Sequence, residues 1–432
     1  MSQTLTQERD AGSSLPLLDR QQARHDYGAV RAMTETLCRP LQPEDCLLQS
    51  ITETSPPKWH LAHVSWFFET FLLQEYLPAY RPFNPRFRYL FNSYYEQLDG
   101  YHPRARRGLL SRPDLDTVYR YRAWVDEHMQ ALIDQAEAEH WPDIALRLAI
   151  GLNHEQQHQE LILTDLKHNF WVNPLLPAYR EELPRSEGRA APLDWHEYPG
   201  GVQEIGCGGD GYAFDNERPR HRVYIAPWRL ASRPVINAEY LAFMDAGGYR
   251  RPELWLSDGW ATVQRLGWRA PLYWLQQDGD WWQYTLGGLR PLNPDETVCH
   301  VSYYEADAFA RWAGKRLPGE QEWEVAAAQR PVAGNLREAG RLHPGIATAP
   351  GLQQLYGDVW EWTSSPYTAY PGYRAPAGAL GEYNGKFMCN QQVLRGGSCV
   401  TPADHVRPSY RNFFYPHDRW QFMGLRLAED AE

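Results

Sequence analysis

Hydrophobic positions in the N-terminal part of the chain follow a helical pattern. Three or four amphipathic segments are visible, near residues 20–38, 58–76, 114–138 and 143–168. Segments of this kind are typical of α-helices that bury one face. They predict a helical domain that occupies the first part of the chain. The Pro- and Arg-rich stretch 77–113 is then a long connection inside that domain, and long connections often carry function.

The pattern changes near residue 172. Several prolines mixed with Arg and Glu follow and indicate a linker or a strap between domains. Beyond it, Gly, Trp and short β-like runs such as 221–225 and 393–398 dominate, with short helices such as 303–314 between them. These features predict an irregular α+β domain with few long elements. The expected division is a helical bundle at 20–172, a strap at 173–197 and an α+β domain at 198–430.

The most informative motif is Asn-His-Glu-Gln-Gln-His-Gln-Glu at residues 153–160. His154 and His158 are four positions apart, so a helix places both imidazoles on one face, one turn apart. Two imidazoles in this position can ligate one metal ion, and imidazole suits iron, zinc, copper and nickel. Glu160 lies off that face, which favours a supporting or capping role over ligation. The alternative is a polar helix face with two solvated histidines.

A third imidazole is available in the string Lys-Trp-His-Leu-Ala-His-Val-Ser-Trp-Phe-Phe-Glu at residues 58–69. His60 and His63 fall on two different stripes of the predicted helix, and both stripes are mostly apolar. Periodicity therefore does not choose between them, and a histidine among aromatic residues is also compatible with a place in the core. Three imidazoles without a carboxylate ligand would leave positions on a metal open for substrate or dioxygen.

Composition narrows the classes of partner. The formal charge of −11 argues against nucleic acid or an anionic membrane as the main partner. No run of about 18 apolar residues is present to span a membrane, and the first 25 residues lack the apolar segment of a signal peptide. The six cysteines form no CxxC pair, which fits a reduced cytoplasm better than a disulfide framework.

Both parts of the chain resemble known domains. The helical part is similar to the DinB-type four-helix bundle, in which one His of a helix and an HxxxH pair hold a metal. The second part is similar to the formylglycine-generating-enzyme/sulfatase-modifying domain, a C-type-lectin-like α+β fold. The strings that carry this second likeness are Phe-Asp-Asn-Glu-Arg-Pro-Arg-His (214–221), Val-Ser-Tyr-Tyr-Glu-Ala (301–306), Lys-Arg-Leu-Pro-Gly-Glu-Gln-Glu-Trp-Glu (315–324), Gly-Asp-Val-Trp-Glu-Trp (357–362), Leu-Arg-Gly-Gly-Ser-Cys (394–399) and Gly-Leu-Arg-Leu (424–427).

Together, the two domains in this order resemble the EgtB-type sulfoxide synthases of ergothioneine biosynthesis, over about residues 25–430. The resemblance implies a non-haem iron enzyme with Fe(2+) as its cofactor. Its partners would be hercynine (trimethylhistidine), a thiol and O₂. Such enzymes join the thiol to the imidazole C2 of hercynine and oxidise the sulfur to a sulfoxide.

The same likeness assigns roles to individual residues. The implied iron ligands are His63, His154 and His158. The amide of Gln157, one residue before His158, would hold the bound imidazole. Asn412, in the string Tyr-Arg-Asn-Phe-Phe at 410–414, matches the position that contacts the carboxylate of the substrate betaine, and Phe413 follows it.

One departure from the family pattern bears on the thiol. Members that use γ-glutamylcysteine carry an acidic residue two positions after the matching Asn, whereas this chain has Phe414. The pair Tyr94–Tyr95 also resembles the branch that uses free L-cysteine. The resemblance therefore implies free cysteine as the thiol donor and hercynylcysteine sulfoxide as the product. Selenoneine synthases and 5-histidylcysteine sulfoxide synthases share this framework and stay open as alternatives.

Residue chemistry suggests further roles. A tyrosine phenol can donate a proton during turnover, so Tyr94 and Tyr95 are candidate catalytic acids. The carboxylate of cysteine favours arginine, and Arg104 and Arg107 follow the tyrosine pair. The trimethylammonium group of hercynine favours aromatic faces. Three aromatic residues of the second domain are available for it: Phe413, Phe414 and Trp420.

Three other functions compete with this interpretation. A zinc-dependent thiol transferase or hydrolase is possible because DinB bundles also hold zinc. A non-catalytic ligand-binding protein with a lectin-like domain would show calcium-type clusters of Asp and Asn, which the sequence lacks. A formylglycine-generating oxidase needs a reactive cysteine pair. The strings around Cys389 and Cys399 do not match that use, and the helical bundle would be unexplained.

Overall fold

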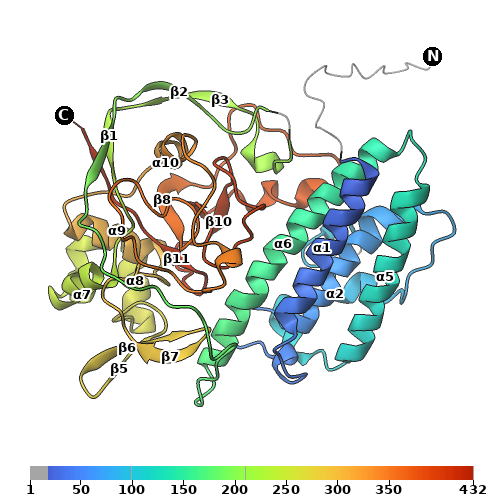
Figure 1. The fold of residues 1–432 in the computed structure, drawn as a ribbon, viewed down its shortest axis with the longest axis horizontal. Helices are drawn as coiled ribbons and strands as arrows, with labels where there is room; N and C mark the ends of the chain where they lie inside the picture. Colours follow the sequence, from blue (N-terminus) through green and yellow to red (C-terminus); the bar gives the residue numbers. More distant parts are fainter. Residues whose placement is uncertain (1–17, 99, 210, 432) are drawn as a thin grey trace.

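The computed structural model describes residues 18–98, 100–209 and 211–431. It shows a bundle of long helices beside a larger and less regular α+β part (Figure 1), which confirms the predicted fold class. All four predicted helical segments are present. The long helices are α1 (Arg20–Cys38), α2 (Pro57–Phe68), α5 (Leu115–Gln135) and α6 (Trp141–Trp171). Helix α2 continues through a π-helical turn, η2 (Glu69–Leu73), into the short α3 (Gln74–Tyr76).

Local sequence signals set where the helices begin. The Asp19 carboxylate accepts a hydrogen bond from the backbone N–H of Gln22 at the start of α1. At the start of α5, the Asp114 carboxylate accepts in the same way from the backbone N–H of Thr117. Helix α2 begins with Pro57, which is favourable at the first helical position because no intrahelical partner is lost there.

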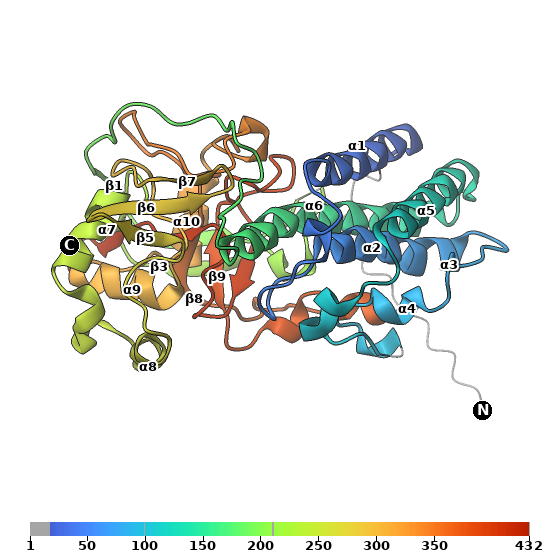
Figure 2. The ribbon, with the colours of Figure 1, turned by 90° about the horizontal axis from the view of Figure 1, so that it is seen from below.

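Helix α2 lies within the helical bundle (Figure 2), where it packs against α5 and α6. It is buried at every one of its 12 positions. Helix α6 comes close to it because Gly151 carries no side chain. A Cβ atom at that position would lie 2.4 Å from the ring of Phe68. This glycine therefore sets the close approach of the two helices that carry the candidate histidines.

The connection 77–113 is ordered by its own polar contacts. It contains α4 (Phe87–Leu90) and two 3₁₀ turns, η3 (Glu96–Leu98) and η4 (Arg104–Leu109). The Asn92 side chain donates to the carbonyls of Tyr95 and Gly100, and it accepts from the backbone N–H of Tyr95. These bonds fix the turn of the segment that carries the tyrosine pair.

After α6, residues 172–194 form no helix or strand. The first strand, β1 (Trp195–Tyr198), begins inside the predicted strap 173–197 and pairs with β4 (Trp228–Ala231). The domain limits predicted from the sequence stay a prediction.

In the described residues of the second part, the strands form four small sheets. The first has the strand order β1–β4–β12 and is antiparallel, with β12 at Ala428–Asp430. The second has the order β10–β9–β8–β11. Its strands are β8 (Trp360–Pro366), β9 (Gln392–Arg395), β10 (Asn412–Phe414) and β11 (Met423–Gly424). The others are the ribbon of β2 (Gly201–Ile205) and β3 (His221–Ile225) and the sheet of β5 (Trp274–Gln277), β6 (Asp280–Thr285) and β7 (Gly288–Pro291).

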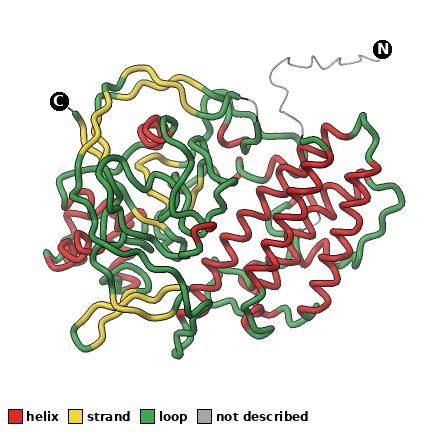
Figure 3. The backbone as a smooth tube through the Cα atoms, in the orientation of Figure 1, coloured by secondary structure: helices red, strands yellow, loops and turns green. Residues whose placement is uncertain are grey.

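Long loops make up much of this part (Figure 3), as the short β-like runs predicted. Its helices are short: α7 (Asn237–Asp245), α8 (Ser257–Leu266), α9 (Tyr303–Trp312) and α10 (Glu320–Ala327). The predicted strand at 221–225 and the predicted helix near 303–314 are both confirmed.

Helix α6 joins the two parts. The buried Glu160 carboxylate accepts hydrogen bonds from the indole N–H of Trp360 and from the hydroxyls of Ser398 and Thr401, each at 2.8 Å. Glu160 therefore lies off the histidine face, as expected, and connects the bundle to the second part. Among the helices that the structure describes, none is both long enough and apolar enough to cross a membrane.

Candidate functional site

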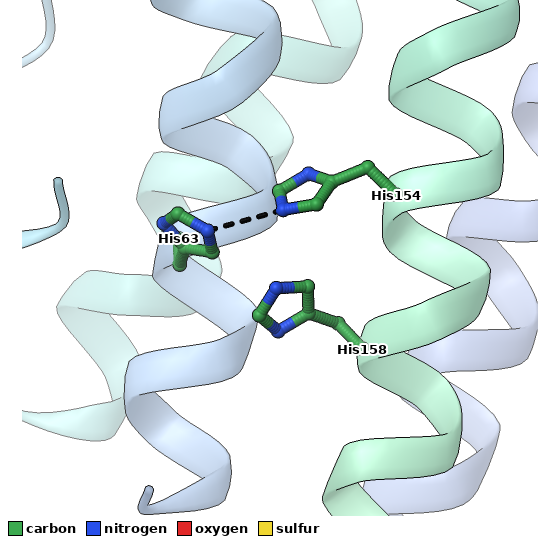
Figure 4. Close-up of side chains that lie close together, drawn as sticks. All are labelled: His63, His154 and His158. Atoms are coloured by element: carbon green, nitrogen blue, oxygen red, sulfur yellow. Dashed lines mark hydrogen bonds between the residues drawn. The ribbon is translucent and has the colours of Figure 1, made fainter. Parts of the chain in front are cut away.

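Three buried imidazoles meet between α2 and α6. His63 lies on α2, and His154 and His158 lie one turn apart on α6 (Figure 4). One ring nitrogen of each lies within 4.8 Å of the others, and the Nε2 atoms of His63 and His154 are 3.1 Å apart. All three side chains are buried. The spacing on α6 thus puts both histidines on one face, as the sequence predicts.

These histidines are in the form that binds a cation. Burial lowers the pKa of His63 and His158 well below the usual value and lowers the pKa of His154 to about 3, so all three rings are neutral near pH 7. The Nδ1–H of His63 donates to the Phe91 carbonyl at 2.5 Å, which leaves the lone pair of Nε2 for a metal. Neutral nitrogen donors that converge in this way fit a divalent first-row ion such as iron(II).

His60 takes a different place. Its Nδ1 lies 2.7 Å from Nδ1 of His158, and its Nε2 lies 3.1 Å from a carboxylate oxygen of Asp165. Burial lowers the pKa of His60, so it is neutral as well. The choice that periodicity left open is therefore answered by geometry, since the structure brings His63 and not His60 into the three-histidine group.

The tyrosine pair lies beside this group. The rings of Tyr94 and Tyr95 stack at 4.7 Å, and Tyr95 also packs at 5.6 Å against Trp66, whose ring stacks on His63. Tyr95 is fully buried, and burial raises the pKa of both phenols, so both carry their proton near neutral pH. From the second part, the Lys386 ammonium donates to the Tyr94 carbonyl and fixes the loop.

Gln157 faces the second part of the chain. Its amide N–H donates to the hydroxyl of Tyr410 at 2.7 Å, and its amide oxygen accepts from the hydroxyl of Tyr383. The Tyr410 hydroxyl also lies 3.0 Å from Nε2 of His405, and the Tyr383 ring lies 5.7 Å from that of His154. The amide is thus held in one orientation next to the histidines.

The sequence interpretation missed Tyr383, Tyr410 and His405. Tyr410 stands in the string 410–414 that carries the family likeness, so its position was available as a signal. Tyr383 follows a 3₁₀ turn, η9 (Ala379–Glu382), in a loop that has no periodic pattern, and no sequence signal identifies it.

The candidate substrate-contacting residues of strand β10 separate into two groups. The Phe413 ring stacks on Tyr367 at 4.0 Å, whereas the Phe414 ring meets the edge of Trp420 at 5.5 Å. Successive residues of a strand point to opposite faces, which explains the separation. The half-buried Asn412 begins this strand, and its amide oxygen accepts from the backbone N–H of Phe413. The three aromatic rings therefore do not form a single cage.

The two candidate arginines also differ. Arg107 is buried, donates to the hydroxyls of Ser55 at 3.0 Å and Ser93 at 3.1 Å, and lies 3.4 Å above the ring of Trp59. Trp59 in turn stacks on His63 at 4.5 Å, so the indole ring of Trp59 lies between Arg107 and the histidine group.

Within the described residues, no carboxylate lies within ion-pair distance of Arg107. Burial and the charge of Arg104 lower the pKa of Arg107, so both disfavour the charged form of its guanidinium. Arg104 is exposed and donates to the Glu53 carbonyl instead. The structure therefore places Arg107, and not Arg104, beside the site.

Comparison with known proteins matches both parts of the chain. The model of the DinB superfamily matches residues 27–162. The model of the sulfatase-modifying factor enzyme 1-like domain matches residues 197–344 and 336–431. The fold class predicted from the sequence, a DinB-like bundle followed by a domain of the formylglycine-generating-enzyme type, agrees with both matches.

Curated relatives match nearly the whole chain. A hercynine oxygenase of Mycolicibacterium thermoresistibile is 36% identical over 413 residues, which cover 88% of this chain and 88% of that protein. A hercynine oxygenase of Mycolicibacterium smegmatis is 34% identical over 87% of this chain and 91% of its own length. A formylglycine-generating enzyme of Streptomyces coelicolor is 30% identical, but the match covers only 54% of this chain and 88% of that protein.

Proposed function

Because this chain belongs to the hercynine oxygenase family, we propose that it joins the thiol of cysteine to the imidazole C2 of hercynine and oxidises the sulfur to a sulfoxide, using iron(II) and O₂. The observation that carries the proposal is the group of three neutral, buried imidazoles, His63, His154 and His158, in the part that matches the DinB superfamily. These three side chains would hold iron(II), which when bound would supply the activation of O₂, the oxidant of the reaction.

The protein contributes the placement of the substrates. Arg107 offers a buried guanidinium for the carboxylate of the amino-acid thiol, where a charge-assisted pair is strong. Phe414 offers no charge to the amino group of a γ-glutamyl extension. These two residues together support free cysteine as the thiol donor.

The imidazole of hercynine fits Gln157, whose amide is already oriented by Tyr383 and Tyr410. Asn412 is the candidate partner of the hercynine carboxylate. The trimethylammonium group cannot donate a hydrogen bond, and the faces of Phe414 and Trp420 suit it. Phe413, packed on Tyr367, supports strand β10 from its other face.

The phenols of Tyr94 and Tyr95 are the candidate proton donors. Both are neutral, Tyr95 is fully buried and Tyr94 is partly buried, and both belong to a loop that Lys386 of the second part holds in place. A neutral phenol in a site shielded from water can deliver one proton to the reacting groups without admitting others.

The test is direct. The protein is loaded anaerobically with iron(II), hercynine and cysteine are added, and O₂ uptake is followed while products are read by mass. Formation of hercynylcysteine sulfoxide supports the proposal. Parallel reactions with a selenol donor and with unmethylated histidine test the selenoneine and 5-histidylcysteine alternatives. A tightly held zinc ion with no O₂ uptake would instead support a zinc-dependent thiol transferase.

A further inference from the structure

A row of polar groups leads away from the three-histidine group. From His158 it passes to His60, which lies next to it, and then to the carboxylate of Asp165. All three side chains are buried, with exposed fractions of 8%, 2% and 1%. His60 and Asp165 have no role in the proposed function, although burying a carboxylate and an imidazole costs free energy.

The hydrogen-bond directions along this row are fixed by chemistry. An ionised carboxylate only accepts, so Nε2 of His60 carries the hydrogen that faces Asp165. A neutral imidazole has a single N–H, so Nδ1 of His60 is an acceptor. The hydrogen between the two rings must then come from Nδ1 of His158. This leaves Nε2 of His158 with a free lone pair, which is what metal binding requires.

The opposite arrangement would block the site. If Asp165 were replaced by a group that donates to His60, the hydrogens along the row would reverse. Nδ1 of His158 would then accept, its Nε2 would carry hydrogen, and that nitrogen could not bind a cation. The carboxylate at position 165 therefore decides which nitrogen of His158 is available.

Asp165 is itself held from two sides. Its Oδ2 accepts from the backbone N–H of Ser55 at 2.8 Å, and its Oδ1 accepts from the indole N–H of Trp420 at 3.1 Å. Ser55 precedes α2, whereas Trp420 belongs to the second part of the chain. The orientation of the carboxylate thus depends on how the two parts pack together.

Building on the proposed iron site, we propose that His60 and Asp165 are positioning residues that fix the tautomer and the ring orientation of His158, with Trp420 coupling them to the second part of the chain. Groups that orient a metal-ligating histidine typically contribute about 10- to 100-fold to metal affinity. His60 does not ligate, so its loss should weaken binding without changing the stoichiometry of one ion per chain.

The experiment measures cobalt(II) binding to the metal-free protein, by competition with a chelator and by the visible absorption of the bound ion. We expect His60→Leu and Asp165→Asn each to raise the Kd for cobalt(II) by about 10- to 100-fold and to shift the absorption bands. His60→Gln should restore most of the affinity, because its amide can accept from His158 and donate to Asp165. Trp420→Phe should have a smaller effect of the same sign.

His168→Gln is the matched control. His168 lies on the same helix and is nearly as buried, but its ring nitrogen contacts Ser50 and not the histidine group. Its Kd and spectrum should equal those of the wild type. Circular dichroism and the melting temperature of each metal-free variant separate a lost fold from a lost ligand orientation.

The outcomes distinguish this inference from the proposed function. A wild-type protein that binds neither cobalt(II) nor iron(II) overturns the proposed metal site itself. A wild type that binds and turns over, with His60→Leu and Asp165→Asn at wild-type Kd and spectrum, overturns only the positioning role. If His60→Leu does not fold, the comparison of His60→Gln with Asp165→Asn decides, and equal affinities would refute the inference.

Discussion

Arg107 offers the sharpest test of how the thiol substrate is recognised. It is a buried guanidinium whose described partners are two serine hydroxyls and the face of Trp59, none of which carries a negative charge. A structural arginine at such depth usually pairs with an acid. We therefore expect its counter-charge to be the carboxylate of the bound cysteine.

The magnitude follows from the type of bond. A hydrogen bond to a charged partner contributes about 1.5–3 kcal/mol, and each 1.4 kcal/mol corresponds to about a factor of ten. Replacing Arg107 by Met should therefore raise the KM for cysteine by roughly 10- to 150-fold, with a much smaller change for hercynine.

Stability separates this role from a structural one. Removing one member of a buried ion pair costs about 3–5 kcal/mol because the other charge is left alone. Among the described residues, no carboxylate within ion-pair distance of Arg107 is left alone by Arg107→Met, and the substitution removes a buried charge whose burial lowers the pKa of Arg107. Removing the buried charge partly offsets the loss of the two hydrogen bonds to serine hydroxyls. We therefore expect the free energy of unfolding to fall by no more than about 2 kcal/mol.

The assay is O₂ uptake with cysteine varied at saturating hercynine, followed by the reverse titration. Arg104→Met is the matched control, since Arg104 is exposed and donates to a backbone carbonyl, and it should leave both KM values close to those of the wild type. An unchanged KM for cysteine in a folded Arg107→Met variant, or an equal rise in both variants, would refute the reasoning.

Four further predictions follow from the same site. His63→Ala should abolish iron binding, as measured by metal analysis after gel filtration; full occupancy would contradict the assignment. Tyr94→Phe or Tyr95→Phe should keep iron but shift the product toward cysteine sulfinate, because general acid catalysis contributes about 10²–10⁴-fold; wild-type rates and mass-resolved product ratios in both would exclude the pair as the acid. The wild type should show a larger kcat/KM for free cysteine than for γ-glutamylcysteine, and Phe414→Asp should narrow that difference. The buried Glu155 carboxylate of α6 accepts hydrogen bonds from Arg31 and Arg122, which hold its pKa below the usual value. This pairing should stabilise the fold at pH values above the unfolded-state pKa of Glu155, and the contribution should be lost as pH falls through the lower folded-state pKa. Glu155→Gln should therefore weaken the dependence of the free energy of unfolding on pH in the acid range.

Some of this structure could be predicted from the sequence because the information is local. Helical periodicity located all four long helices of the bundle. The four-residue spacing of His154 and His158 was enough to place both rings on one face of α6. Short runs of β-branched and aromatic residues likewise predicted strands such as β3.

Other features could not be predicted from the sequence because they arise from contacts between segments that are distant along the chain. Helix α2 is buried on every side, so no polar stripe marks which of its histidines joins His154 and His158 in the three-histidine group. The sequence also grouped Arg104 with Arg107, although only packing against Trp59 and the serines distinguishes the buried side chain from the exposed one. Tyr383 reaches Gln157 from an irregular loop 226 residues further along the chain.

The junction of the two parts is where these long-range contacts concentrate. Glu160 and Asp165 lie on α6, and each accepts an indole N–H from the second part, from Trp360 and Trp420 respectively. A helical bundle alone could bring the three histidines together, but it would leave both carboxylates without these partners. Because buried carboxylates without donors are costly, the second part stabilises the same helix that carries two of the candidate ligands. All three candidate ligands thus belong to the bundle, whereas the partners that satisfy the buried carboxylates of α6 come from the second part of the chain.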